Sequence, residues 1–104
     1  MIIVEGWVRL GSATEIERLR SAAVKMMHTT KVSETGCLEY AYAIDLAEPD
    51  LLRIIERWTD EAALTAHFAT PHMAAFGQAM ASANITAMLV KAYAGEEVRT
   101  LMEQ

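Results

Sequence analysis

The stretch that decides the fold is ERWTDEAALTAHFATPHMAAF, which runs from Glu56 to Phe76. It starts inside LLRIIERW, a run rich in apolar residues that predicts a strand over residues 51–58. By period-two alternation, Leu52, Ile54, Glu56 and Trp58 should share one face of this strand. The stretch therefore begins as a mostly apolar strand face that carries one carboxylate.

The rest of the stretch predicts two short helices. Thr59 can cap a helix that begins with Asp60 and Glu61, because acids suit the positive end of a helix. Pro71 should end or kink this helix and could be the first residue of the next. At 100° per residue, His67 and Phe68 fall on the helix face turned toward the sheet.

The chain before this stretch predicts a strand and a long helix. IIVEGWVRL, over 2–10, has strand composition, with its even positions forming an apolar face. Ser12 and Glu15 have capping-box spacing, and apolar residues then recur at helical intervals to about Lys31. TTKVSETG, over 29–36, is polar and is predicted to be a loop.

Two further strands complete the pattern. CLEYAYAID, over 37–45, alternates and should form a hairpin with 51–58 across the turn signal LAEPD. NITAMLVKAYA, over 84–94, predicts the last strand, and residues 95–104 form a polar tail. The order βαββαβ predicts an α+β, ferredoxin-like antiparallel sheet in a single domain over 1–104, with its core in 2–94.

In this arrangement the helices cover only one face of the sheet. The other face is expected to be partly apolar, with Trp7, Ile55 and Val90 among its residues. The chain is 53% hydrophobic, a high share for a small domain. A second sheet packed face to face would cover this surface, so a homodimer is expected.

Charge and cysteine content restrict the partners. Nine basic residues are scattered among fourteen acidic ones, for a net charge of −5, which disfavours nucleic acid and anionic membranes as partners. Cys37 is the one cysteine, so a reducing, cytoplasmic location is expected. The N-terminal residues lack the pattern of a signal peptide, and no apolar run reaches membrane-spanning length.

Common cofactor and metal motifs are absent from the sequence. The five glycines build neither a dinucleotide fingerprint nor a P-loop, and there is no CxxC, HExxH or GxSxG. The three histidines, His28, His67 and His72, are too few and too irregularly spaced for a convincing zinc cage. We therefore expect no metal and no cofactor if the protein is an enzyme.

His67 and Glu56 are the candidate catalytic residues. A histidine turned toward the sheet can act as a general base or donor, or can be a half-buried side chain bonded to a backbone carbonyl. Glu56 is a carboxylate on an apolar strand face and needs a partner. It could orient His67, or it could face solvent or bond to Arg57.

Five aromatic or imidazole side chains are candidates for substrate binding. Tyr40 and Tyr42 lie on one strand face, and their hydroxyls either contact a substrate or are satisfied within the core. Trp58 either stacks on a ligand or fills the end of the core. His72 borders the apolar stripe that contains Phe76, and either gates the pocket or is partly exposed.

Two segments carry a resemblance to a known family. ETGCLEY, over 34–40, and the stretch from Glu56 to Phe76 resemble the signatures of the antibiotic biosynthesis monooxygenase domain. The resemblance implies a dimeric α+β barrel. It also implies a small phenol, quinol or anthrone oxidised by O2 without metal, flavin or haem, in a dry pocket with a base.

Two departures and two alternatives accompany this resemblance. Thr35 stands where many members have proline. The haem-degrading branch of similar fold has a ligating histidine near the position of Gly77, which disfavours haem binding or degradation here. A non-catalytic dimer that binds a small aromatic molecule is the other alternative.

Overall fold

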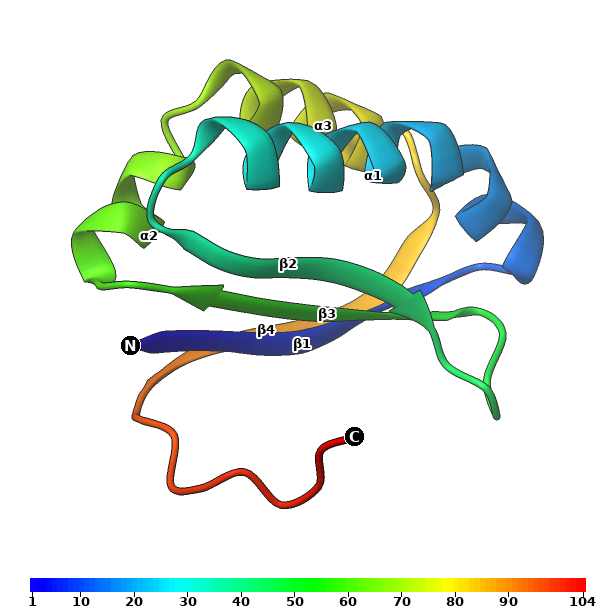
Figure 1. The fold of residues 1–104 in the computed structure, drawn as a ribbon. Helices are drawn as coiled ribbons and strands as arrows, with labels where there is room; N and C mark the ends of the chain where they lie inside the picture. The colour runs from blue at the N-terminus through cyan, green and yellow to red at the C-terminus, as the bar shows by residue number, and fades with distance from the viewer.

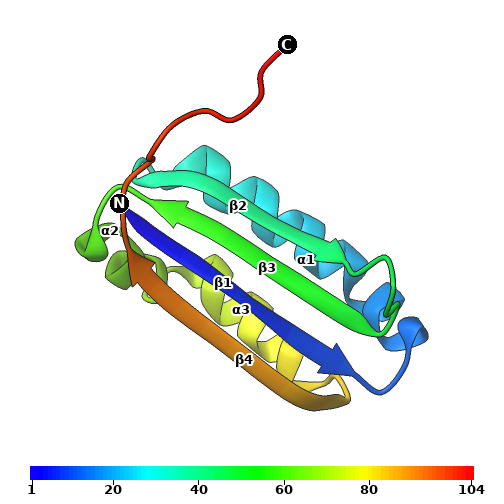
Figure 2. The same cartoon turned by 90° about the horizontal axis from the view of Figure 1, so that it is seen from below.

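The computed structural model describes residues 1–104 as a four-stranded antiparallel sheet with three helices on one face, as Figures 1 and 2 show. The fold is α+β and ferredoxin-like, as the sequence predicts. Its elements are β1 (Ile2–Leu10), α1 (Ala13–Ser33), β2 (Cys37–Ile44), β3 (Leu51–Trp58), α2 (Glu61–His67), α3 (Pro71–Ala81) and β4 (Ile85–Ala94).

The strands lie in the order β2-β3-β1-β4, so β2 and β4 are the edges of the sheet. Val4 lies opposite Glu56, which in turn lies opposite Tyr40. Directly opposed residues share a face, and this register puts the even positions of β1 and β3 against the helices. The predicted face of β3 is confirmed, because Leu52, Glu56 and Trp58 are all buried.

The core lies between this sheet face and the helices in two adjoining clusters. One gathers around Trp58, whose side chain is 0% exposed, and includes Tyr40 and Phe76. The other gathers around Val8 and Leu10 where α1 begins. Apolar burial of this kind is the main stabilising term in so small a fold.

The helix boundaries in the opening stretch confirm one prediction and correct another. Pro71 is the first residue of α3, capped by the Thr70 hydroxyl, which accepts from the Met73 amide at 3.2 Å. Asp60, rather than Thr59, caps α2, because its carboxylate accepts from the Ala63 amide at 2.8 Å.

The long helix differs from its prediction at both ends. Ser12 is the N-cap residue but makes no side-chain cap bond, and the Glu15 amide donates to the Ser12 backbone carbonyl at 3.1 Å. The Glu15 carboxylate does not close a capping box either, because it binds Arg18 and the Asn84 amide. At its other end α1 continues through residues predicted as loop and stops at Ser33.

Two side chains are placed differently from the prediction. Val90 lies opposite Gly6 in the register, so it belongs to the helix-covered face rather than to the bare one. Phe68 is the C-cap of α2, past the last helical turn, and is mostly exposed.

The second face of the sheet has no helix over it. Trp7, Ile55, Leu89 and Tyr93 occupy this face in alternation with charged residues, and the last three are exposed. The tail after β4 leaves the sheet on this side (Figure 1) and extends beyond the outline of the strands and helices when the sheet is seen from below (Figure 2). None of the helices is both long and apolar enough to cross a bilayer.

A pair of glycine substitutions tests the close approach of β1 and β4. A Cβ on Gly6 would lie 2.5 Å from the Leu89 carbonyl oxygen and 2.7 Å from the Val90 Cα, both backbone atoms. We expect Gly6→Ala to lower the free energy of unfolding by about 1–3 kcal/mol through overpacking.

Gly77→Ala is the matched control, because nothing lies within 4 Å of a Cβ built there in α3. It should raise the free energy of unfolding by up to about 1 kcal/mol, since alanine favours a helix. Urea denaturation measures both changes. Equal stabilities for the two variants would contradict the described strand packing.

Candidate functional site

A cavity of about 450 Å³ lies between the helix-covered face of the sheet and the helices α2 and α3. Its size falls within the usual range for small-molecule sites, roughly 300–1,000 Å³. Most of its wall is hydrophobic, with a few polar side chains among the apolar ones. Five predicted site residues line it: His67, Glu56, Tyr40, Tyr42 and Phe76.

His67 is the last residue of α2, and its side chain is 1% exposed. Its Nδ1 lies 2.8 Å from Oε2 of Glu34. An ionised carboxylate can only accept hydrogen bonds, so in the neutral imidazole Nδ1 carries the proton and Nε2 is left as an acceptor. Nε2 is buried and has no hydrogen-bond partner. The tautomer therefore leaves a free basic nitrogen on a residue that lines the cavity.

Glu34 is the residue that sequence reasoning missed. It is the C-cap of α1, and its Oε2 also lies 2.6 Å from Nε2 of His72. The loop after it is tied to the end of β3, where the Thr59 amide donates to the Gly36 carbonyl at 2.9 Å. The only signal in the sequence was that Glu34 opens the family-like segment ETGCLEY.

Glu56 has a different partner from the one considered in the sequence. Its Oε1 accepts from the Trp58 indole N–H at 2.9 Å, two positions along the same strand face. Burial raises the pKa of the Glu56 carboxyl, while the bond from Trp58 and the proximity of His67 oppose this rise. Glu34, not Glu56, orients the His67 imidazole.

The hydroxyls of Tyr40 and Tyr42 form a pair 2.6 Å apart. Burial raises the pKa of both phenols, so both are protonated at neutral pH. One hydroxyl donates to the other, and the second proton is left for another acceptor. Phe76 stacks on the Tyr42 ring at 5.3 Å between centroids and forms an aromatic wall.

Two predicted site residues do not line this cavity. Trp58 is buried behind Glu56 and acts as its hydrogen-bond donor. His72 lines a neighbouring cavity between α1 and α3 and is bonded to Glu34. The two histidines, to which the sequence analysis gave separate roles, therefore meet at one carboxylate.

Lys91 and Met88 of β4 line the large cavity, and the sequence analysis gave neither of them a role.

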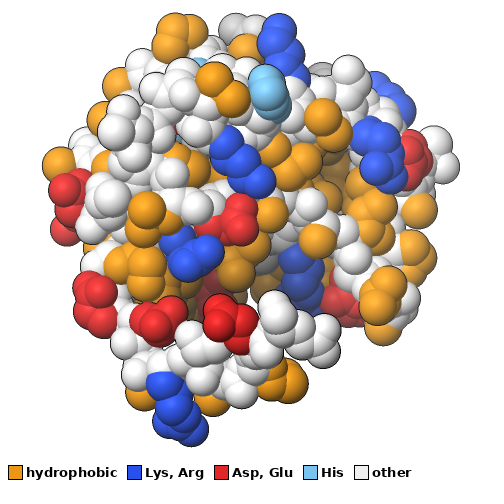
Figure 3. All heavy atoms as spheres, in the orientation of Figure 1, with side chains coloured by type: hydrophobic (Ala, Val, Ile, Leu, Met, Phe, Trp, Pro, Cys, Tyr) orange, Lys and Arg blue, Asp and Glu red, His pale blue; other side chains and the backbone are white.

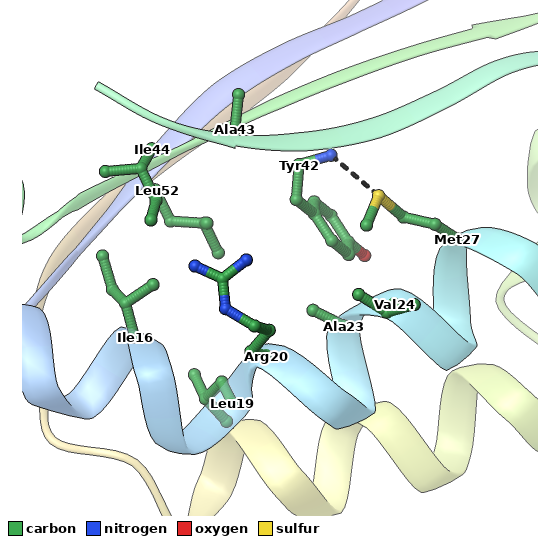
Figure 4. A pocket seen from close by; sticks show the side chains of 10 residues that line it. All are labelled: Ile16, Leu19, Arg20, Ala23, Val24, Met27, Tyr42, Ala43, Ile44 and Leu52. Carbon is green, nitrogen blue, oxygen red and sulfur yellow. Dashed lines mark hydrogen bonds between the residues drawn. The ribbon is translucent and has the colours of Figure 1, made fainter. Parts of the chain in front are cut away.

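A smaller cavity of about 190 Å³ lies between α1 and β2. Figure 4 shows that its wall is almost wholly apolar, with Arg20 as the one charged side chain. Arg20 is exposed and pairs with Glu17. Figure 3 views the molecule from the side of α1 and β2, where hydrophobic side chains show between charged ones. Its wall holds no carboxyl and no imidazole, and the hydroxyl of Tyr42, which also lines it, is paired with that of Tyr40.

The large cavity combines an apolar wall with several polar groups. These are a free imidazole nitrogen, a buried carboxyl, a pair of neutral phenols and Lys91. Such a set can bind a flat apolar molecule that carries hydroxyl groups and can take up a proton from it.

Comparison with known proteins identifies the family of the chain. The model of the family described as antibiotic biosynthesis monooxygenase matches residues 1–79. The chain belongs to the antibiotic biosynthesis monooxygenase family. The resemblance seen in the two sequence segments is thereby confirmed.

Individual relatives differ in how much of the chain they match. "Probable quinol monooxygenase YgiN" of Escherichia coli K12 is 39% identical over 59 residues, which span 49% of this chain and 57% of that protein. A Deinococcus radiodurans structure described with the family name is 30% identical, with a TM-score of 0.87 over 99% of this chain and 100% of that one.

A Caulobacter crescentus structure described with the same family name shares the fold. It has a TM-score of 0.83 and 21% identity, and the match covers 92% of this chain and 90% of that one. At this identity the likeness concerns the arrangement of strands and helices.

Proposed function

We propose that the protein is a monooxygenase that oxidises a phenol, quinol or anthrone with O2, and that it needs no cofactor. One oxygen atom enters the substrate and the other leaves as water. For a hydroquinone the products are a hydroxyquinone and water, and the substrate supplies all four electrons. Family membership and the quinol monooxygenase name of one relative support this proposal.

The observation that carries the proposal is the unpartnered Nε2 of His67. A buried acceptor without a hydrogen bond costs about 1–3 kcal/mol, so such a group calls for an explanation. In our proposal Nε2 accepts the proton of a substrate hydroxyl. The resulting anion passes one electron to O2, and the two radicals combine.

Glu34 makes His67 suited to this task. By holding the proton on Nδ1, it keeps Nε2 available, and it stabilises the imidazolium that forms when Nε2 is protonated. This is the role of the carboxylate in a catalytic triad. Without Glu34 the ring would be free to turn and to carry its proton on either nitrogen.

Glu56 and the tyrosine pair would bind the remaining substrate oxygen atoms. The free proton of the Tyr40–Tyr42 pair can be donated to a substrate carbonyl or hydroxyl. The pKa of Glu56 is raised by burial, which favours holding a proton beside the cavity. Phe76 provides a flat surface for an aromatic ring.

We also propose that two chains associate through the bare face of the sheet. Trp7, Ile55, Leu89 and Tyr93 lie on this face and have no helix over them. Exposed apolar surface of this extent in a small chain favours a protein partner. A second copy supplies the same surface, and a sheet packed on a sheet would cover both.

Oxygen uptake by chelator-treated protein, measured with a panel of hydroquinones and anthrones, tests the activity. We expect His67→Ala and Glu56→Gln each to lower the rate by about 10²-fold or more, because the first removes the base and the second removes the titratable carboxyl that holds a proton beside the substrate oxygen atoms. His28→Ala is the matched control, since this histidine on α1 is exposed and does not line the cavity.

Folding of each variant is checked by circular dichroism. Saturable binding without oxygen uptake would instead favour the non-catalytic aromatic binder. Turnover that survives both substitutions would remove His67 and Glu56 from the mechanism.

Sedimentation velocity at micromolar concentration tests the association. The unmodified protein should sediment as a dimer, and Trp7→Glu should shift it toward a monomer by placing a charge in the interface. Val32→Glu is the control, because Val32 is equally apolar but is exposed on α1, away from the sheet. A monomeric unmodified protein would refute the dimer.

A further inference from the structure

Three side chains converge at one point beside the cavity proposed to hold the substrate, and one of them, His67, also lines that cavity. Glu34 caps α1, His67 ends α2 and His72 opens α3. Each offers one ligand atom, and the three atoms lie within 4.8 Å of one another. From this convergence we propose that the cluster is a binding site for one divalent first-row transition ion, and that the bound ion switches off His67 as a base.

The donor set fits such an ion. Two imidazole nitrogens and a carboxylate oxygen suit zinc and iron-group ions, and three protein ligands leave a position open for water. Cys37 does not belong to the set, because its Sγ is directed to the Glu39 carbonyl at 3.5 Å. Regular motif spacing does not reveal this site, since its ligands come from three separate elements.

The two rings already face the same point. Nδ1 of His67 and Nε2 of His72 both lie within hydrogen-bond distance of Oε2 of Glu34, at 2.8 and 2.6 Å. An ion would take the place of the two bridging protons, with ligand distances of about 2.0–2.2 Å. Small rotations of the rings and of the Glu34 carboxylate would bring the three atoms around it.

The site can be reached from solvent. His67 is enclosed, but Glu34 and His72 retain 12% and 16% of their side-chain exposure. His72 also lines a cavity of about 450 Å³ between α1 and α3, bordered by Thr29 and Phe76. This cavity supplies an entry path and room for a water ligand.

Binding would reverse the tautomer of His67. A neutral imidazole that coordinates an ion through Nδ1 carries its one proton on Nε2. No proton is gained or lost by the ring, but the free acceptor described above becomes a donor. The consequence for turnover rests on the proposed function, whereas ion binding itself does not.

Calorimetric titration with Zn²⁺ tests the site in chelator-treated, untagged protein. We expect one ion per chain, and we expect His72→Gln and Glu34→Gln each to weaken binding by at least about 100-fold, beyond the effect of losing an outer-shell partner. His28→Gln is the matched control and should bind as the unmodified protein does. His72→Gln is the more secure variant for folding, because His72 is partly exposed.

The tautomer provides a second, independent readout. In ¹H–¹⁵N spectra, Zn²⁺ should move the His67 proton from Nδ1 to Nε2, and Zn²⁺ should inhibit oxygen uptake reversibly. Absent binding, or binding that persists in His72→Gln, would overturn the site. Binding without the tautomer change would overturn the switch. If the protein shows no oxygenase activity, the titration and the spectrum still decide the ion site.

Discussion

The carboxylate of Glu34 is the constraint on which the candidate site depends. One oxygen atom holds two imidazoles, and in doing so it joins the end of α1 to the end of α2 and the beginning of α3. Because this carboxylate fixes the proton of His67 on Nδ1, the opposite nitrogen remains a buried, unpartnered acceptor. The proposed chemistry and the proposed ion site follow from the same bridge.

The sheet supplies the opposite side of the cavity. Strand alternation places Glu56 among apolar neighbours, where only the Trp58 indole donates to it. Burial raises the pKa of this carboxyl and of the two tyrosine hydroxyls. The base, His67, thus lies on the helix side of the cavity. The groups on the strand side are the Glu56 carboxyl and the tyrosine hydroxyls, whose raised pKa values favour their protonated forms. Proton transfer from a phenol needs such a base on one side and hydrogen-bond donors on the other.

Most of the fold could be predicted from the sequence, because strand and helix periods, the hairpin turn and Pro71 are local signals. The site was less predictable. Alternation placed Glu56, Tyr40 and Tyr42 correctly on the inner face, and helical spacing turned His67 inward. The pairing of His67 with Glu34 was not foreseen, because it joins segments far apart in sequence. Val90 was misplaced because strand register cannot be read from one strand alone.

A crystal structure with a hydroquinone bound under anaerobic conditions tests the central claim most directly. It should place a phenolic oxygen within about 2.6–3.2 Å of Nε2 of His67, with the ring against Phe76 and Nδ1 still bonded to Glu34. A ligand held instead in the apolar cavity between α1 and β2, or Nε2 occupied by a group of the protein, would contradict the claim.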